Sequence, residues 1–173
     1  MAEIKTWHRA IIVFFAIAGL TNSSFLVRMP LVRELLGVNN QQLGFILLAF
    51  SIGSLTSLTF VGKTIARIGT KPIIIAGFIT TSLSTILQVT FVTNQSAIGF
   101  AFAAFITGFA AGAADVAINV DGAAIEKRIG KSSLPRMHAA FSIGTLTGAT
   151  MGAVLGLKAF AVAIIGGLTS GMG

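Results

Sequence analysis

The chain has 173 residues, of which 54% are hydrophobic and 10% are charged, and its mean hydropathy is +0.92. Soluble domains carry about 25% charged residues and disordered chains have low hydrophobicity, so this composition excludes both classes and requires a lipid environment. The chain has no cysteine, which excludes disulfide frameworks and cysteine-ligated zinc, and its net charge of +7 comes from short Lys and Arg clusters between apolar runs, a pattern typical of membrane topology and not of nucleic-acid binding.

Five uncharged stretches predict the membrane helices in chain order. They cover residues 10–27, 35–62, 72–114, 139–157 and 159–173. A membrane helix needs about 20 residues to cross about 30 Å of hydrocarbon, so the third stretch is long enough for two crossings, and polar residues 93–96 mark the turn between them. The sequence therefore predicts one membrane domain over residues 1–173, with helices at 10–29, 42–62, 72–92, 96–119, 138–157 and a short 159–173.

The distribution of Lys and Arg predicts the orientation of these helices. If the N-terminus is inside, the inner segments hold nine basic residues, which are Lys5, Arg9, Lys63, Arg67, Lys71, Lys127, Arg128, Lys131 and Arg136. The outer segments hold Arg28, Arg33 and Lys158. Because cytoplasmic loops carry the excess of Lys and Arg, we expect a multi-pass membrane protein with a cytoplasmic N-terminus.

Polar side chains inside the predicted helices are candidates for a solute pathway, because such groups are costly in lipid and usually face a bundle interior or a water-filled cavity. Asn22 lies in the outer half of the first helix, and Asp115 and Asn119 share one face of the fourth. Both Asn side chains are equally consistent with hydrogen bonds to a neighbouring helix. Asp115 is predicted near the inner end of its helix, where it either pairs with Arg67 or is solvated among the headgroups.

Glycines at a spacing of four predict close helix packing, because residues four apart share a helix face and small residues let membrane helices approach closely. The glycines with this spacing are Gly108 and Gly112 in the fourth helix and Gly144, Gly148, Gly152 and Gly156 in the fifth. We expect a packing seam at both places. The partner of the Gly144 face lies either in this chain or outside it.

Patterns typical of catalysis are missing from the sequence. Gly62-Lys63-Thr64 lacks the preceding glycine of a phosphate-binding loop. No catalytic triad stands out, and two histidines without cysteine do not make a metal cluster. The sequence predicts a protein that is not an enzyme and has no cofactor or metal.

The segment 62–72 resembles the loop signature of the major facilitator superfamily, G-x-L-x-D-R-x-G-R-R/K, which lies between the second and third helices of that family. The residues that match this inner-loop signature are Gly62, Arg67, Gly69 and Lys71. Ala66 stands in place of its Asp and Thr70 in place of its first terminal Arg.

A second set of residues resembles the fucose-permease-like bacterial branch of the same superfamily. The sequence G-x-x-D-V-x-x-N spans residues 112–119, Glu126 follows, and H-A-x-F-S-x-G spans residues 138–144. Arg28-Met29-Pro30 also resembles the first outer loop of that branch. The match covers nearly the whole chain but about half of a full transporter, which has twelve helices in two halves.

The resemblance implies an all-α polytopic bundle, the N-terminal six-helix half of a major-facilitator-type fold, in a bacterial inner membrane. The implied function is secondary active or facilitative transport of a small solute by alternating access, with a sugar as a candidate substrate and a proton as a candidate coupling ion. The implied partners are the lipid bilayer, the solute and a second transporter half or another copy of the chain. Two alternatives stay open, a non-transporting membrane interaction or assembly protein and a truncated, inactive fragment.

Overall fold

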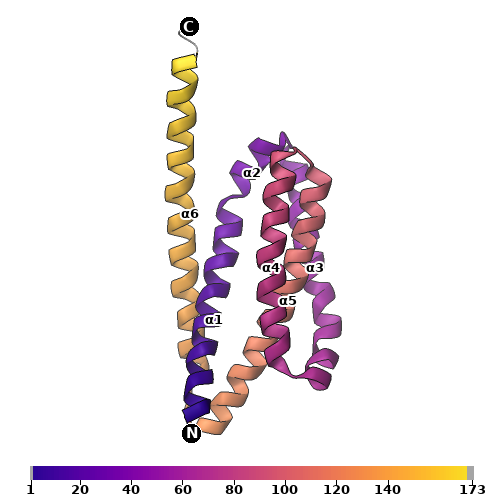
Figure 1. Cartoon of the computed structure of the whole chain (residues 1–173), viewed down its shortest axis with the longest axis vertical. Helices are drawn as coiled ribbons and strands as arrows, with labels where there is room; N and C mark the ends of the chain where they lie inside the picture. The colour runs from indigo at the N-terminus through magenta and orange to yellow at the C-terminus, as the bar shows by residue number, and fades with distance from the viewer. Residues whose placement is uncertain (1, 171–173) are drawn as a thin grey trace.

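The described part of the chain consists of helices joined by short turns, without strands, in the computed structural model, which confirms the predicted all-α membrane bundle (Figure 1). The structure describes the backbone of residues 2–170 and the side chains of residues 4–155. The helices are α1 (Ala2–Val27), α2 (Met29–Leu36), α3 (Asn40–Ile68), α4 (Thr70–Thr93), α5 (Ala97–Ile129) and α6 (Leu134–Ser170). Within the described residues, α1, α3, α4 and α5 are long and apolar enough to cross a membrane.

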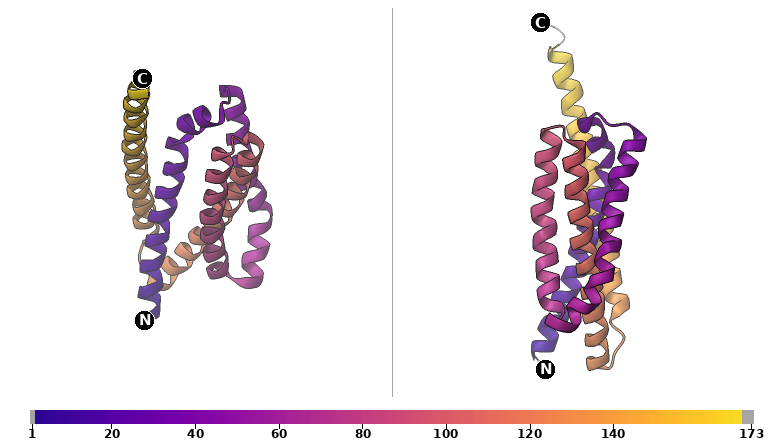
Figure 2. Two further views of the ribbon diagram at one scale, coloured as in Figure 1. Left: turned by 45° about the horizontal axis from the view of Figure 1, so that its top comes forward. Right: turned by 90° about the vertical axis from the view of Figure 1, so that its right-hand side faces the viewer.

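The helices form two groups. In one group α1 packs along α6, and in the other α5 packs along both α3 and α4. Figures 1 and 2 show the two groups joined at one end by α2 and at the other by the last part of α5, which crosses toward α1. The groups therefore contact each other mainly near the two ends of the bundle.

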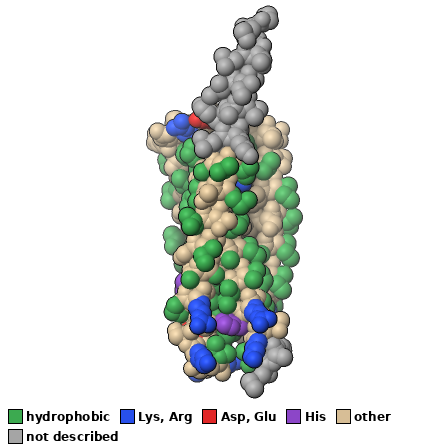
Figure 3. All heavy atoms as spheres, turned by 90° about the vertical axis from the view of Figure 1, so that its left-hand side faces the viewer, with side chains coloured by type: hydrophobic (Ala, Val, Ile, Leu, Met, Phe, Trp, Pro, Cys, Tyr) green, Lys and Arg blue, Asp and Glu red, His purple; other side chains and the backbone are tan. Residues whose placement is uncertain are grey.

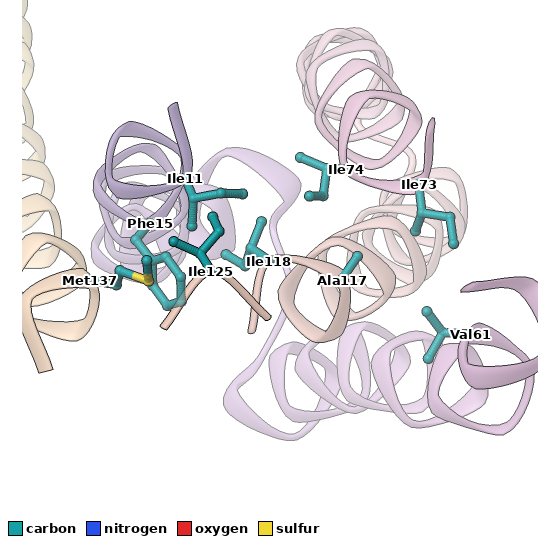
Figure 4. Packing of buried hydrophobic residues seen from close by; sticks show 9 residues of the cluster. All are labelled: Ile11, Phe15, Val61, Ile73, Ile74, Ala117, Ile118, Ile125 and Met137. Carbon is teal, nitrogen blue, oxygen red and sulfur yellow. The ribbon is translucent and has the colours of Figure 1, made fainter. Parts of the chain in front are cut away.

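Each end of the bundle is closed by a cluster of buried apolar side chains. At the end where the chain begins, Ile11 and Phe15 of α1 pack with Ile118 and Ile125 of α5 and with Met137 of α6 (Figure 4). The same cluster continues between α3, α4 and α5 through Val61, Ile73, Ile74 and Ala117. At the other end a second cluster joins α2, α3 and α5, and it consists of Met29, Leu36, Ile46, Phe100 and Ala104.

The structure corrects the predicted loop between residues 62 and 72. α3 continues to Ile68, so Gly62 and Arg67 lie in the helix, and Gly69 alone connects α3 to α4. Gly69 has a φ of 81°, in the region that glycine enters without steric cost. Lys71 lies in the first turn of α4. The chain therefore reverses direction between α3 and α4 at Gly69, without a longer loop.

The boundaries of α1 and α5 also differ from the predictions. The helix predicted at 10–29 begins at Ala2 and ends at Val27, and the short α2 follows it. α5 continues beyond Asn119 to Ile129, because residues 120–129 contain no Pro and only one Gly, and it ends where Gly130 has a φ of 64°.

One helix, α6, covers the region where the sequence predicts two helices at 138–157 and 159–173. Residues 157–160 are Leu-Lys-Ala-Phe, with neither Gly nor Pro to interrupt a helix. Gly156, like the other side chains after residue 155 and like residues 171–173, lies outside the described residues.

Glu126 fixes the start of α6 against the end of α5. Its Oε2 accepts hydrogen bonds from the backbone N–H groups of Ser133 (2.6 Å) and Leu134 (2.8 Å). These N–H groups have no acceptor within the helix, and a negative charge is favourable at a helix N-terminus. His8 Nε2 lies 2.5 Å from Ser133 Oγ, which ties the N-terminal part of α1 to the same turn.

We expect Glu126→Ala to lower the midpoint of thermal unfolding, because both N–H groups lose their acceptor. Glu126→Gln keeps an acceptor oxygen without the charge and should lie between Glu126→Ala and the natural protein. Thermal unfolding of the three proteins in one detergent measures this order. Equal unfolding midpoints for Glu126→Ala and the natural protein would show that water accepts these hydrogen bonds in place of the carboxylate without loss of stability.

An internal repeat relates α3 to α6. Residues 49–56 and 140–147 share the sequence Ala-Phe-Ser-Ile-Gly-x-Leu-Thr. A Cβ added to either repeated glycine would collide with a backbone carbonyl oxygen of a neighbouring helix, and the reverse collisions occur from glycines on those helices. The four approaches are Gly53 to Phe105, Gly144 to Ala16, Gly108 to Phe50 and Gly19 to Phe141. The α3–α5 pair and the α6–α1 pair are therefore built by the same backbone-to-backbone contacts.

Candidate functional site

A cavity of about 870 Å³ lies between the two helix groups. Its walls come mainly from α1, α4 and α5, and α2, α3 and α6 contribute at the edges. This volume is in the range of small-molecule sites. Most lining side chains are apolar, and the polar ones are Thr21, Asn22, Ser24, Arg28, Ser54, Thr81, Thr85, Gln88, Thr93, Thr107 and Asp115.

Several hydroxyl groups on the cavity wall donate their protons to their own helices. Thr21 Oγ1 donates to the carbonyl oxygen of Ile17 (2.9 Å) and Thr85 Oγ1 donates to that of Thr81 (2.9 Å). A hydroxyl has one proton and two lone pairs. These oxygens can therefore only accept a further hydrogen bond, so the polar part of the wall is rich in acceptors.

Asp115 lies near the middle of α5, and the predicted end of this helix at residue 119 is wrong. α5 continues for 14 residues after Asp115, about 21 Å of helix, whereas the predicted helix ended at residue 119. Arg67 is in the last turn of α3. Among the described residues Asp115 makes no ion pair with Arg67, and the acid instead lines the cavity.

The three predicted pathway residues have different positions. Asn22 and Asp115 both line the cavity, from α1 and α5. Asn119 is not among the lining residues, and its Nδ2 donates to the backbone oxygen of Asp115 (2.8 Å) and lies 3.5 Å from Asp115 Oδ1. The structure thus brings Asn22 and Asp115 to one cavity and gives Asn119 a partner in its own helix.

The predicted packing glycines lie at close helix contacts. Gly112 faces α3, where an added Cβ would lie 2.6 Å from Ser57 Oγ, and Gly108 faces Phe50 of the same helix. On α6, Gly144 and Gly148 approach backbone oxygens of α1, and a Cβ on Gly152 would lie 3.2 Å from Val27 Cγ1. α1 therefore covers the Gly144 face as far as the side chains are described.

The end of the bundle at which the chain begins carries a polar cluster that the sequence analysis did not predict. Trp7 Nε1 donates to Asp121 Oδ2 (2.5 Å), and Lys71 Nζ lies 4.6 Å from the centroid of the Trp7 ring. Asp121 was not considered because the sequence analysis ended the fourth helix at residue 119 and placed Asp121 outside it. Of the four residues that match the inner-loop signature, Lys71 has this described contact, while a Cβ at Gly62 or Gly69 would meet nothing within 4 Å.

Charge is unevenly distributed over the face of the molecule drawn in Figure 3. In Figure 3, Lys, Arg and His side chains gather near the end where the chain begins, a few charged groups lie at the other end, and the surface between them is hydrophobic or uncharged. This surface suits a bilayer with charged groups at both interfaces.

A buried polar group between α4 and α5 also escaped the sequence analysis. Gln88 Nε2 donates to Thr107 Oγ1 (2.6 Å), Thr107 Oγ1 donates to Ser84 Oγ (2.8 Å), and Ser84 Oγ donates to the carbonyl oxygen of Ala103 (2.7 Å). The sequence signal was the spacing of Ser84 and Gln88, four residues apart, which places both on one face of their helix.

Comparison with known proteins identifies the relatives of the chain. The family model described as Major Facilitator Superfamily matches residues 10–170. An uncharacterized MFS-type transporter of Yersinia pestis is 30% identical over 135 residues, which are 78% of this chain and 34% of that protein. An uncharacterized transporter of Sinorhizobium fredii is 24% identical over 159 residues, which are 88% of this chain and 40% of that protein. No solved structure matches the chain.

Proposed function

The chain belongs to the major facilitator superfamily, and from this premise we propose that it is the N-terminal half of a secondary transporter for a small solute. The observation that carries the proposal is the cavity between α1, α4 and α5, whose mostly apolar wall includes Asn22, Gln88 and Asp115. Polar groups that face a cavity inside a membrane bundle are candidates for a solute pathway. The chain spans 34% and 40% of the two relatives named above, so alternating access requires a second bundle, supplied by a second half or another copy.

We also propose the finer assignment to the fucose-permease-like branch, on the residues 112–119, Glu126 and 138–144. A sugar is then the first substrate to test and a proton the first coupling ion, with Asp115 as the acid that faces the cavity. The competing function, a docking protein that uses the Gly144 face, gains no support because α1 covers that face over its described part.

Uptake by membrane vesicles tests the transport proposal. Vesicles that contain the full-length protein as the cell makes it should accumulate a radiolabelled sugar, and Asp115→Asn should reduce the initial rate. Vesicles without the protein are the control. A protein that folds stably but gives no uptake above this control, with or without a proton gradient, would favour the assembly function.

The proposed orientation places the N-terminus and most basic residues in the cytoplasm of a bacterium. Lys63 lies near the end of α3 and Asn94 directly follows α4, so one crossing of the membrane separates them, and the sequence has no cysteine. We expect a membrane-impermeant maleimide added to intact cells to label Asn94→Cys and to label Lys63→Cys only after the cells are broken. The same compartment for both thiols would refute the topology.

A further inference from the structure

Gln88 is a polar side chain enclosed by the bundle and also part of the cavity wall. It is 6% exposed, and its partners Thr107 and Ser84 are 6% and 1% exposed. Gln88 and Thr107 line the cavity, whereas Ser84 does not. The buried group therefore reaches from the α4–α5 contact to the cavity surface.

The hydrogen bonds fix which end of the Gln88 amide faces Thr107. The Ser84 hydroxyl donates its one proton to the carbonyl oxygen of Ala103, and the Thr107 hydroxyl donates its one proton either to Ser84 Oγ (2.8 Å) or to the same carbonyl oxygen (3.0 Å). Thr107 Oγ1 can then only accept, so it must face the amide nitrogen of Gln88. If the amide were reversed, Thr107 would have to give up its bond to Ser84 or to Ala103, and the group would lose one hydrogen bond.

The amide oxygen of Gln88 is left without a partner among the described residues. It is not sealed in the protein, because the fully buried side-chain atom that lacks a partner in the described chain is Thr145 Oγ1. The small exposed part of Gln88 therefore includes this oxygen, and Gln88 lines the cavity. No described protein group donates to this oxygen, so a solute donor that enters the cavity can bind to it in place of water.

We propose that Gln88 is a solute-binding residue whose free amide oxygen accepts a hydrogen bond from an uncharged donor group of the solute, either a hydroxyl or an amide N–H. Thr107 and Ser84 are positioning residues that hold the amide nitrogen on α5 and direct the oxygen into the cavity. This inference rests on the proposed transport function, and it adds the chemistry of the group that the site recognises.

The first test is the accessibility of the side-chain positions to water. In the full-length protein, with any cysteine outside residues 1–173 replaced by Ser, Gln88→Cys should react with a small methanethiosulfonate reagent and Ser84→Cys should not. Both side chains are buried on the same face of α4, but only Gln88 lines the cavity. A difference in reactivity between the two thiols therefore reports access through the cavity. Failure of Gln88→Cys to react while the folded protein elutes as a single species would overturn the proposal.

The second test measures solute binding through a reporter thiol at Ala111, another lining residue. Mannitol supplies hydroxyl donors, acetamide supplies amide donors, and acetate has the shape of acetamide without any donor. We expect mannitol or acetamide, but not acetate, to slow the labelling of Ala111→Cys. Adding Gln88→Leu should weaken this protection about three- to tenfold, whereas Thr90→Ala, a change on α4 away from the cavity, should leave it unchanged.

The outcomes separate the two proposals. Protection that is equal in Gln88→Leu and in the natural protein would overturn the role of Gln88 and leave transport standing. Absence of protection by every probe, together with absence of sugar uptake, would overturn the transport function itself. Protection by mannitol alone identifies a hydroxyl donor, and protection by acetamide alone identifies an amide donor.

Discussion

Gly144→Ala is expected to lower the free energy of unfolding by about 1–3 kcal/mol, the usual cost of an extra methyl group in a packed interior. The added Cβ would collide with the backbone oxygen of Ala16, and a backbone atom cannot turn away as a side chain does. α1 and α6 would have to move apart along their whole contact. Thermal unfolding in detergent, followed by the loss of the monodisperse elution peak, measures the effect.

Gly44→Ala is the matched control for this substitution. Gly44 also lies in a helix, but a Cβ there would meet nothing within 4 Å. Because alanine is favoured over glycine in helices by about 1 kcal/mol, Gly44→Ala should be neutral or stabilising. The repeat also predicts that Gly53→Ala, which collides with Phe105, costs about as much as Gly144→Ala. Similar stability for Gly144→Ala and Gly44→Ala would contradict the close approach of α1 and α6.

Trp7→Ala is expected to lower the free energy of unfolding by about 2–4 kcal/mol. The substitution removes the hydrogen bond to the Asp121 carboxylate and the contact with the Lys71 ammonium. A hydrogen bond to a charged group contributes about 1.5–3 kcal/mol to stability, and an exposed cation–π pair contributes about 0.5–1 kcal/mol. These contacts join α1 to α5 and α4, so limited proteolysis near the start of the chain should also become faster.

Trp7→Phe separates the two contributions, because it keeps an aromatic ring for Lys71 and removes the N–H group. We expect it to lose most of the hydrogen-bond contribution and to keep the contact with Lys71. Asp121→Asn keeps an acceptor oxygen and should be milder than Trp7→Ala. If Trp7→Ala and Trp7→Phe were as stable as the natural protein, the cluster would not hold the bundle together at this end.

The membrane helices could be predicted well because lipid leaves few choices for an apolar stretch of about 20 residues. The uncharged runs therefore predict the main body of α1, α3 and α4. The use of uncharged runs to locate helices placed the end of α5 too early, because α5 continues through charged residues. Asp121 and Glu126 are tolerated in α5 because Trp7 and the N–H groups of the α5–α6 turn provide their partners.

The candidate site could be predicted only in part. Asn22 and Asp115 stand out in an apolar sequence and both line the cavity. Gln88 did not stand out, because its role depends on Thr107, which is 19 residues away along the chain and becomes a neighbour only when α4 packs on α5. Predictions from one helix at a time cannot include such a partner.

The backbone contacts within the α1–α6 and α3–α5 pairs have a mechanical consequence. Where two helices touch through glycine and carbonyl groups, there are no rotamers that can readjust, so neither pair can slide along its axis without separating. Each pair should therefore move as a stiff unit. A change in the width of the space between them must then be absorbed by bending where α2 and the last turns of α5 connect the two units.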